Sequence, residues 1–159
     1  MAVLGGTYSG HPASMLAAKV AMTHLVEHED EIYPRLSDLG RKVRDALETG
    51  FAEEGILARC TGSGPELPFG SSLAMVHFPY DEGTEITTPE DVHDPTVCDV
   101  ALRAQVLGPA LLLEGVHMVQ GHGSAATTHS DEDMELLKEA CRRVARRVKP
   151  YMTEHSSTG

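Results

Sequence analysis

The sequence predicts a mixed α/β or α+β domain with a small sheet. Two observations indicate this class: runs with helical periodicity alternate with short β-branched runs, and a long amphipathic helix comes last. With 159 residues the chain is long enough for one domain with a hydrophobic core. We find no internal repeat or low-complexity tract that would indicate a different architecture.

The first two elements are expected to be helices. Pro12 suits a first helical turn because its missing N–H would be unpaired there, and strong helix formers continue over 13–26. This stretch is apolar on nearly all sides and rich in small residues, so we expect it to be buried. After a polar joint at 28–30, apolar residues recur every three or four positions from Ile32 to Phe51. They predict an amphipathic helix that ends near Gly55.

Short strands and loops fill the middle of the chain. Strands are expected at 56–60 and 71–78, with a turn at 62–65 between them. The acidic, proline-containing region 79–95 is a loop. A helical run at 97–113 is interrupted at Gly108-Pro109, and a brief β-branched segment at 116–119 precedes a glycine loop at 121–123.

The last helix has the clearest signals. Ser130 and Asp133 form a start like a capping box, acidic residues fill the first turn, and basic residues fill the end, as the helix dipole favours. One apolar stripe runs along it through Met134, Leu137, Cys141, Val144 and Val148.

Composition excludes several function classes. The net charge is −11, which disfavours binding to nucleic acid or to anionic lipid. Cys60, Cys98 and Cys141 are too far apart for a CxxC metal site and do not resemble a disulfide framework. The sequence has no signal peptide pattern and no apolar run of membrane-spanning length. We therefore expect a cytoplasmic protein without a membrane partner.

A glycine-rich loop at 5–12 is the main candidate for a binding site. Glycine lets backbone N–H groups converge, Thr7 and Ser9 add hydroxyls, and the loop leads into a helix N-terminus, so it could hold a phosphate. The alternative is a plain connecting loop, because a glycine-rich helix start is a weak signal by itself.

The same loop resembles a known family. Gly-Thr-Tyr-Ser-Gly-His-Pro at 6–12 and the apolar helix after it are similar to the Gly-Thr-x-Ser-Gly-Asn-Pro segment of class III pyridoxal-phosphate aminotransferases, above all glutamate-1-semialdehyde aminomutases. His11 stands where the family usually has Asn. Four later segments resemble the family in the same order, at 33–40, 71–78, 112–118 and 127–133. The resemblance covers nearly the whole chain.

The resemblance implies the small C-terminal domain of a fold-type-I aminotransferase, with helices on one face of a short, largely antiparallel sheet. Residues 1–28 would be the cofactor-phosphate loop and linking helix, 29–151 the small domain, and 152–159 a flexible tail. Gly6 and Thr7 would bind the phosphate of pyridoxal 5′-phosphate across the dimer interface. No catalytic residue and no metal ligand is assigned.

The family's Schiff-base lysine and the acid at the pyridine nitrogen precede the Gly-Thr motif, so this chain looks like the C-terminal third of an aminotransferase or aminomutase. Each of the four lysines lies in a helical run that does not suit the Schiff-base role: Lys19, Lys42, Lys138 and Lys149. We expect no activity from the chain alone, and a partner that is either a second copy or an upstream cofactor domain. The alternative is a non-catalytic binding or assembly module with the same fold.

Other candidate sites have weaker support. His117, His122 and His129 surround a glycine loop and could in principle gather a metal ion, but no carboxylate or thiol lies nearby at ligand spacing, so we favour scattered polar histidines. The basic cluster at 142–149 could bind an anion, although its fit to the helix dipole favours a solvated face. Ser63 and Ser124 lack the surroundings of a hydrolase nucleophile.

Overall fold

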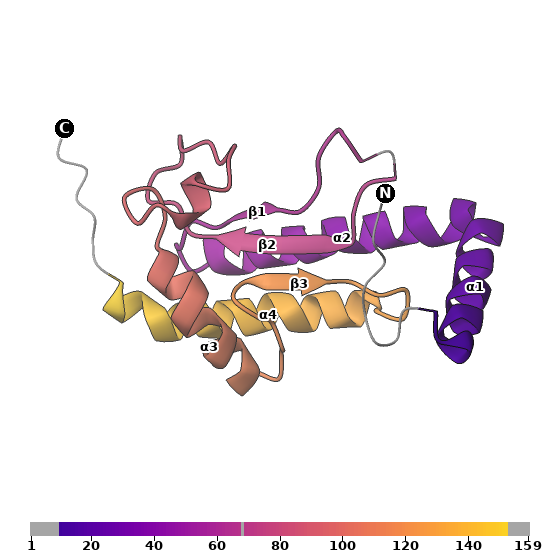
Figure 1. Ribbon diagram of the computed structural model, residues 1–159. Helices are drawn as coiled ribbons and strands as arrows, with labels where there is room; N and C mark the ends of the chain where they lie inside the picture. Colours follow the sequence, from indigo (N-terminus) through magenta and orange to yellow (C-terminus); the bar gives the residue numbers. More distant parts are fainter. Residues whose placement is uncertain (1–9, 68, 153–159) are drawn as a thin grey trace.

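Two long helices pack behind a three-stranded sheet in the computed structural model, which describes residues 10–67 and 69–152 (Figure 1). Strands β1 (Arg59–Thr61), β2 (Leu73–His77) and β3 (His122–Ser124) pair in that order, and both pairings are antiparallel. Helices α2 (Glu29–Ala52) and α4 (Asp131–Val148) lie side by side on one face. The predicted class, with a short antiparallel sheet and helices on one face, is confirmed.

The core lies between the two long helices and the sheet. Phe51 of α2 packs edge-on against Phe78 just after β2, with 5.0 Å between ring centroids. Gly50 lets the helices approach closely, since a Cβ there would lie 2.7 Å from Cys141 Cβ. The capping box of α4 is confirmed: Ser130 N–H donates to Asp133 Oδ2 at 2.8 Å, and Asp133 N–H donates to Ser130 Oγ. This signal explains why the boundary of α4 was predictable.

Strand β3 lies further along the chain than the β segment predicted at 116–119. The prediction placed a β segment at 116–119 and a loop at 121–123, whereas β3 is His122–Ser124 and Val119 forms only an isolated bridge with His122. Gln120 and Gly121 both have positive φ, 51° and 80°, as a tight two-residue hairpin turn requires. The glycine therefore marks the turn itself and not the middle of a loop. Strand β1 is likewise displaced, to 59–61 from the predicted 56–60.

The helical run at 97–113 has its irregularity one turn earlier than predicted. Leu102–Val106 is a π-helical turn, in which Leu107 N–H donates to Leu102 O, and α3 (Leu107–Leu113) follows with Gly108-Pro109 inside it. Pro109 has no N–H for the preceding turn, and the wider turn directly before it accommodates this loss. Two short 3₁₀ turns complete the described elements, at Asp91–His93 and Lys149–Tyr151.

Helix α1 (Pro12–Glu27) has the predicted position but not the predicted burial. None of its residues is buried, and it projects from one end of the molecule at an angle to α2 (Figure 1). Among the described residues almost nothing packs over this helix, so the burial expected from its apolar faces would require a surface that these residues do not supply. No helix in the described part of the chain is both long and apolar enough to span a membrane.

Candidate functional site

The two residues predicted to bind the cofactor phosphate, Gly6 and Thr7, lie outside the described residues. The described part of the chain begins with Gly10, whose φ of 88° lies in the left-handed region that favours glycine. His11 then takes an extended conformation as the N-cap, and Pro12 opens the helix as predicted. The phosphate-binding role of Gly6 and Thr7 stays a prediction.

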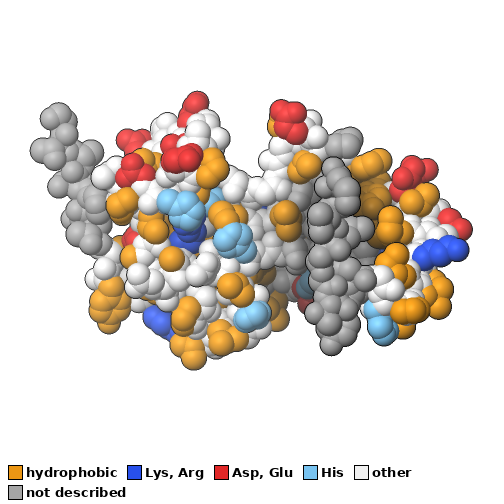
Figure 2. All heavy atoms as spheres, viewed as in Figure 1, with side chains coloured by type: hydrophobic (Ala, Val, Ile, Leu, Met, Phe, Trp, Pro, Cys, Tyr) orange, Lys and Arg blue, Asp and Glu red, His pale blue; other side chains and the backbone are white. Residues whose placement is uncertain are grey.

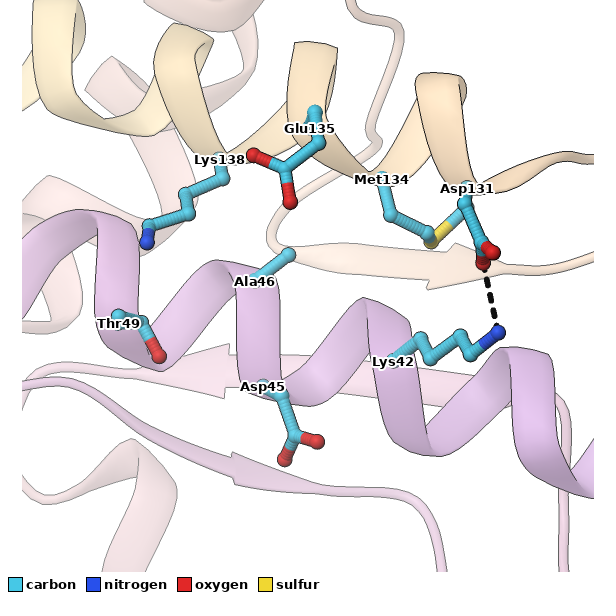
Figure 3. A pocket seen from close by; sticks show the side chains of 8 residues that line it. All are labelled: Lys42, Asp45, Ala46, Thr49, Asp131, Met134, Glu135 and Lys138. Carbon is cyan, nitrogen blue, oxygen red and sulfur yellow. Dashed lines mark hydrogen bonds and ion pairs between the residues drawn. The ribbon is translucent and has the colours of Figure 1, made fainter.

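A groove between the start of α4 and the middle of α2 contains two of the four lysines. It has a volume of about 460 Å³, and Figure 3 shows Lys42 and Lys138 on facing helices at its margin. Lys42 Nζ lies 2.6 Å from Asp131 Oδ1 and 3.2 Å from Asp38 Oδ2. Hydrogen bonds to the Asp131 and Asp38 carboxylates raise the pKa of Lys42. Lys42 is therefore held as an ammonium ion, which is not a nucleophile.

The other three lysines are hydrogen-bonded or exposed. Lys138 Nζ is paired with Glu53 at 2.7 Å, and Lys149 Nζ donates to the Glu54 carbonyl at 2.6 Å. Lys19 lies on the exposed helix α1. A lysine that attaches to a carbonyl cofactor needs a neutral amine, usually obtained by burial away from carboxylates. That no lysine of this chain fills that role stays a prediction.

Two of the three histidines predicted to be scattered share a second groove. His117 and His129 line a space of about 340 Å³ together with apolar residues of α4. His129 Nδ1 lies 2.8 Å from Ala126 N and accepts its hydrogen bond, so this ring holds a turn. In the part of the chain that the structure describes, no three histidine, cysteine or acidic side chains are grouped to hold a metal ion.

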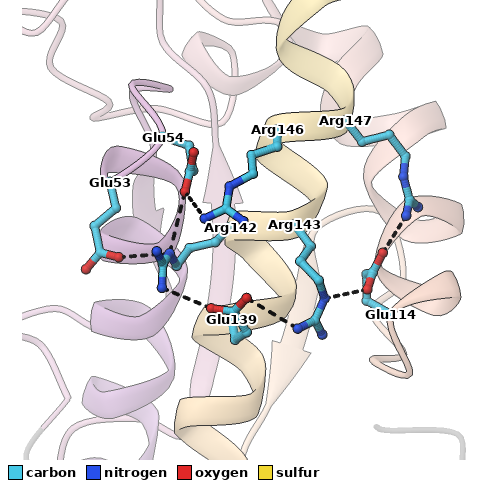
Figure 4. Close-up of polar contacts among 8 residues, drawn as sticks. All are labelled: Glu53, Glu54, Glu114, Glu139, Arg142, Arg143, Arg146 and Arg147. Carbon is cyan, nitrogen blue, oxygen red and sulfur yellow. Dashed lines mark hydrogen bonds and ion pairs between the residues drawn. The ribbon is translucent and has the colours of Figure 1, made fainter.

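The basic cluster at the end of α4 is matched by acids from neighbouring elements. Figure 4 shows Glu114 between two arginines, and the distances are 2.6 Å to Arg143 Nε and 2.6 Å to Arg147 Nη2. On the other side, Arg146 Nη2 lies 2.7 Å from Glu54 Oε1. The Arg143 and Arg147 guanidinium groups hold the pKa of Glu114 below its usual value. The cluster joins α4 to its neighbours, which disfavours the anion-binding alternative.

The sequence analysis did not predict a polar cluster formed by His77, Arg103 and His93. His77, at the end of β2, is fully buried, and Arg103, in the π-helical turn, is only 5% exposed. Arg103 Nη1 donates to His77 Nδ1 at 2.9 Å, and Nη2 donates to His93 Nδ1 at 3.2 Å. The only signals in the sequence were a histidine within a β run and an arginine within an apolar helical run. Neither signal indicates that the two residues meet.

Comparisons of sequence support a relation to aminotransferases. The chain is 26% identical to a glutamate-1-semialdehyde 2,1-aminomutase from Haloarcula marismortui over 149 residues, which covers 85% of this chain. It is 38% identical to the enzyme of the same name from Halorubrum lacusprofundi over 93 residues, 58% of this chain. It spans 33% and 17% of the lengths of these curated relatives. No family model matches the chain.

Solved structures show the same fold. An omega-transaminase from Sphaerobacter thermophilus superposes with a TM-score of 0.65 at 20% identity, over 93% of this chain and 31% of that one. A structure described as a transaminase with PLP bound gives a TM-score of 0.61 at 22% identity, over 94% of this chain and 30% of that one. The fold is thus that of a part of such enzymes, with helices and a small antiparallel sheet.

Proposed function

We propose that this chain, which is similar to the C-terminal part of class III aminotransferases, is that part of a pyridoxal-phosphate-dependent aminotransferase or glutamate-1-semialdehyde-aminomutase-like enzyme. The region matched to the aminomutase from Haloarcula marismortui covers 85% of this chain but only 33% of that enzyme. The remaining two thirds of such an enzyme would have to come from another segment. On this proposal the chain has no amino-transfer activity by itself.

The observation that carries the proposal is the state of the lysines. Pyridoxal phosphate, when bound, supplies the electron sink for amino transfer, and its enzyme supplies the lysine that attaches it. In the described chain, Lys42 and Lys138 are paired with carboxylates, and Lys149 donates to a backbone carbonyl. These pairings support the proposal that the lysine that attaches the cofactor comes from another segment, and no catalytic step is assigned to the described residues.

Helix α1 supports an upstream cofactor domain as the partner. Its large apolar side chains are mostly exposed, including Leu16 at 63%, Val20 at 62% and Met22 at 66%. Figure 2 shows hydrophobic side chains spread over this helix at the right of the molecule. An apolar surface of this extent is typical of an interface. We propose that the cofactor-binding domain covers it, while Gly6 and Thr7 reach the cofactor phosphate of the partner subunit.

A non-catalytic assembly module is the second candidate function. The same exposed face of α1 supports it, because an apolar interface serves a structural partner as well as an enzyme domain. The two candidates differ in a simple observation. An adjacent upstream reading frame that encodes the lysine-bearing domain favours the enzyme, and a different neighbour favours the module.

Reconstitution tests the proposal directly. The 159-residue chain is mixed with the lysine-bearing N-terminal two thirds of a glutamate-1-semialdehyde 2,1-aminomutase, and amino transfer is measured against each part alone. We expect activity only in the mixture. In parallel, the chain alone is incubated with pyridoxal phosphate and reduced with borohydride. Stoichiometric labelling of one lysine together with turnover by the chain alone would overturn the proposal.

Thr7 tests the phosphate role in the reconstituted enzyme. A hydrogen bond to a charged phosphate contributes about 1.5–3 kcal/mol, so Thr7→Ala should weaken cofactor retention by roughly tenfold or more. Thr7→Ser keeps the hydroxyl and should be nearly neutral. Ser124→Ala, in a strand to which we assign no phosphate contact, is the matched control. Equal cofactor affinity for the wild type and Thr7→Ala would remove the role assigned to Gly6 and Thr7.

A further inference from the structure

Arg103 is a buried cation for which the described residues supply no counter-charge. Its side chain is 5% exposed, and charged side chains are rarely buried this deeply unless they are paired with an acid. Its two hydrogen-bond partners are both histidines, His77 and His93. Among the described residues no carboxylate forms an ion pair with it, and no further hydrogen bond of its guanidinium is found. Two of its five N–H donors are thus used, and neither bond neutralises the charge.

Both histidines act as neutral acceptors. Arginine only donates, so Nδ1 of each ring must accept, and the proton of each ring is on Nε2. In His77, Nε2–H then donates to Thr61 Oγ1 at 2.9 Å. Burial, and then electrostatic interaction, above all with the positive charge of Arg103, lower the pKa of His77 to about 4. The His93 ring is exposed, so its Nε2–H is a further donor available at the surface.

The carboxylates of Asp91, Asp94 and Asp99 accept hydrogen bonds from residues near them in the sequence. Asp91 Oδ2 accepts from Thr87 N and Thr88 N, at 2.9 and 2.8 Å. Asp94 Oδ1 accepts from Thr96 at 2.6 Å, and Asp99 Oδ1 accepts from Leu102 N at 2.8 Å. The titratable groups that act on His77 electrostatically are Arg103, His122 and His93. Figure 2 shows histidine side chains gathered around a basic side chain on this face, below the acidic loop.

We propose that Arg103 and His93, beside His122, form a binding site for a small oxyanion, a carboxylate or a phosphate group. The site lies where the ends of β2 and β3 meet the π-helical turn. An oxyanion supplies the charge that Arg103 lacks and accepts from the N–H groups that the two histidines leave unused. The inference rests on these contacts alone and does not require the proposed aminotransferase function.

Anion titration of the full chain tests the site. Inorganic phosphate and succinate are added separately at constant ionic strength, and the ring ¹⁵N and ¹H signals of the histidines are followed by NMR. We expect a saturable shift of His93, with His117 unchanged because it lies in a different groove. Saturation by succinate alone identifies a carboxylate ligand, saturation by phosphate alone a phosphate group, and saturation by both a general oxyanion site. Each of these supports the proposal.

A substitution that supplies the missing charge gives a second test. His93→Glu places a carboxylate beside Arg103 at an exposed position that should fold. It should raise the melting temperature and weaken anion binding by roughly tenfold or more, since it competes for the same donors. Arg103→Lys keeps the charge but loses the planar fork, and should also weaken binding. His117→Glu is the matched control and should change neither property.

Two results would overturn the site. The first is the absence of a saturable His93 shift with either anion. The second is anion binding that His93→Glu leaves unchanged, together with a melting temperature that falls, because Arg103 would then be only a structural partner of His77. Neither readout depends on amino transfer, so failure here is distinguishable from failure of the proposed function.

Discussion

Helices α1 and α4 have similar lengths but opposite relations to the rest of the chain. In α4 the apolar residues form one stripe, and every member of it is buried, with Val144 fully so. In α1 apolar residues lie on nearly all sides, and no residue is buried. An apolar stripe specifies a single packing face, whereas a helix that is apolar all round requires partners on several sides. We therefore expect α1 to pack against a surface that the described residues do not supply.

The largest expected effect is the difference in the free energy of unfolding between substitutions on α4 and on α1. Leu137→Ala on α4 removes a side chain that is 8% exposed and should lower the free energy of unfolding by about 2–5 kcal/mol. Leu16→Ala on α1, where the side chain is 63% exposed, should change it by less than about 0.5 kcal/mol. Urea unfolding at equilibrium measures both. Equal losses for the two variants would show that α1 belongs to the same core.

The second expected effect concerns association through α1. With no covering domain present, we expect self-association that depends on concentration, and Leu16→Glu should weaken it by about tenfold or more, because one buried leucine contributes about 1.5–3 kcal/mol. Sedimentation and hydrophobic dye binding measure this. Leu136→Glu is a matched control on α4, since that side chain is 52% exposed. A wild-type chain that stays monomeric and binds no dye would contradict the comparison.

The third expected effect concerns the start of α4. Ser130→Ala removes the acceptor for Asp133 N–H and should lower the free energy of unfolding by about 1 kcal/mol. Thermal unfolding measures the loss, with Ser124→Ala in β3 as the control. A Ser130→Ala variant as stable as the wild type would show that the capping box does not stabilise this helix.

The smallest expected effect is at the end of α4, where Glu114 joins Arg143 and Arg147. Ion pairs of this kind stabilise weakly, so Glu114→Gln should lower stability slightly at pH 7, and less in high salt. The arginines hold the pKa of Glu114 below its usual value of 4.5. Its contribution is therefore present above pH 4.5 and is lost as the pH falls through the lowered pKa.

Unfolding at several pH values checks this sign. The difference between the wild type and Glu114→Gln should shrink as the solution becomes more acidic. A difference that grows on acidification would mean that the carboxylate does not stabilise the fold through its charge.

Local signals explain which elements were predictable. Ser130 with Asp133, and the stripe from Met134 to Val148, determine α4 by contacts within a few residues of each other. The resemblance of the loop at 6–12 agrees with the similarity to glutamate-1-semialdehyde 2,1-aminomutases, although Gly6 and Thr7 themselves are outside the described residues. The sequence analysis predicted the wrong position for β3 because that position depends on which segment pairs with β2. One such contact, from Val76 N–H to Gly121 O, joins distant parts of the chain.

The sequence by itself determined the long helices, the capping box of α4 and the net charge, because periodicity and caps are local properties. Only the tertiary structure decided which groups pair with Lys42, Lys138 and Lys149. It also decided that Arg103 meets His77 and His93. These last three residues come from separate elements, and no spacing rule links a strand end, a 3₁₀ turn and a π-helical turn. The packing of those elements brings the three basic side chains together at one place.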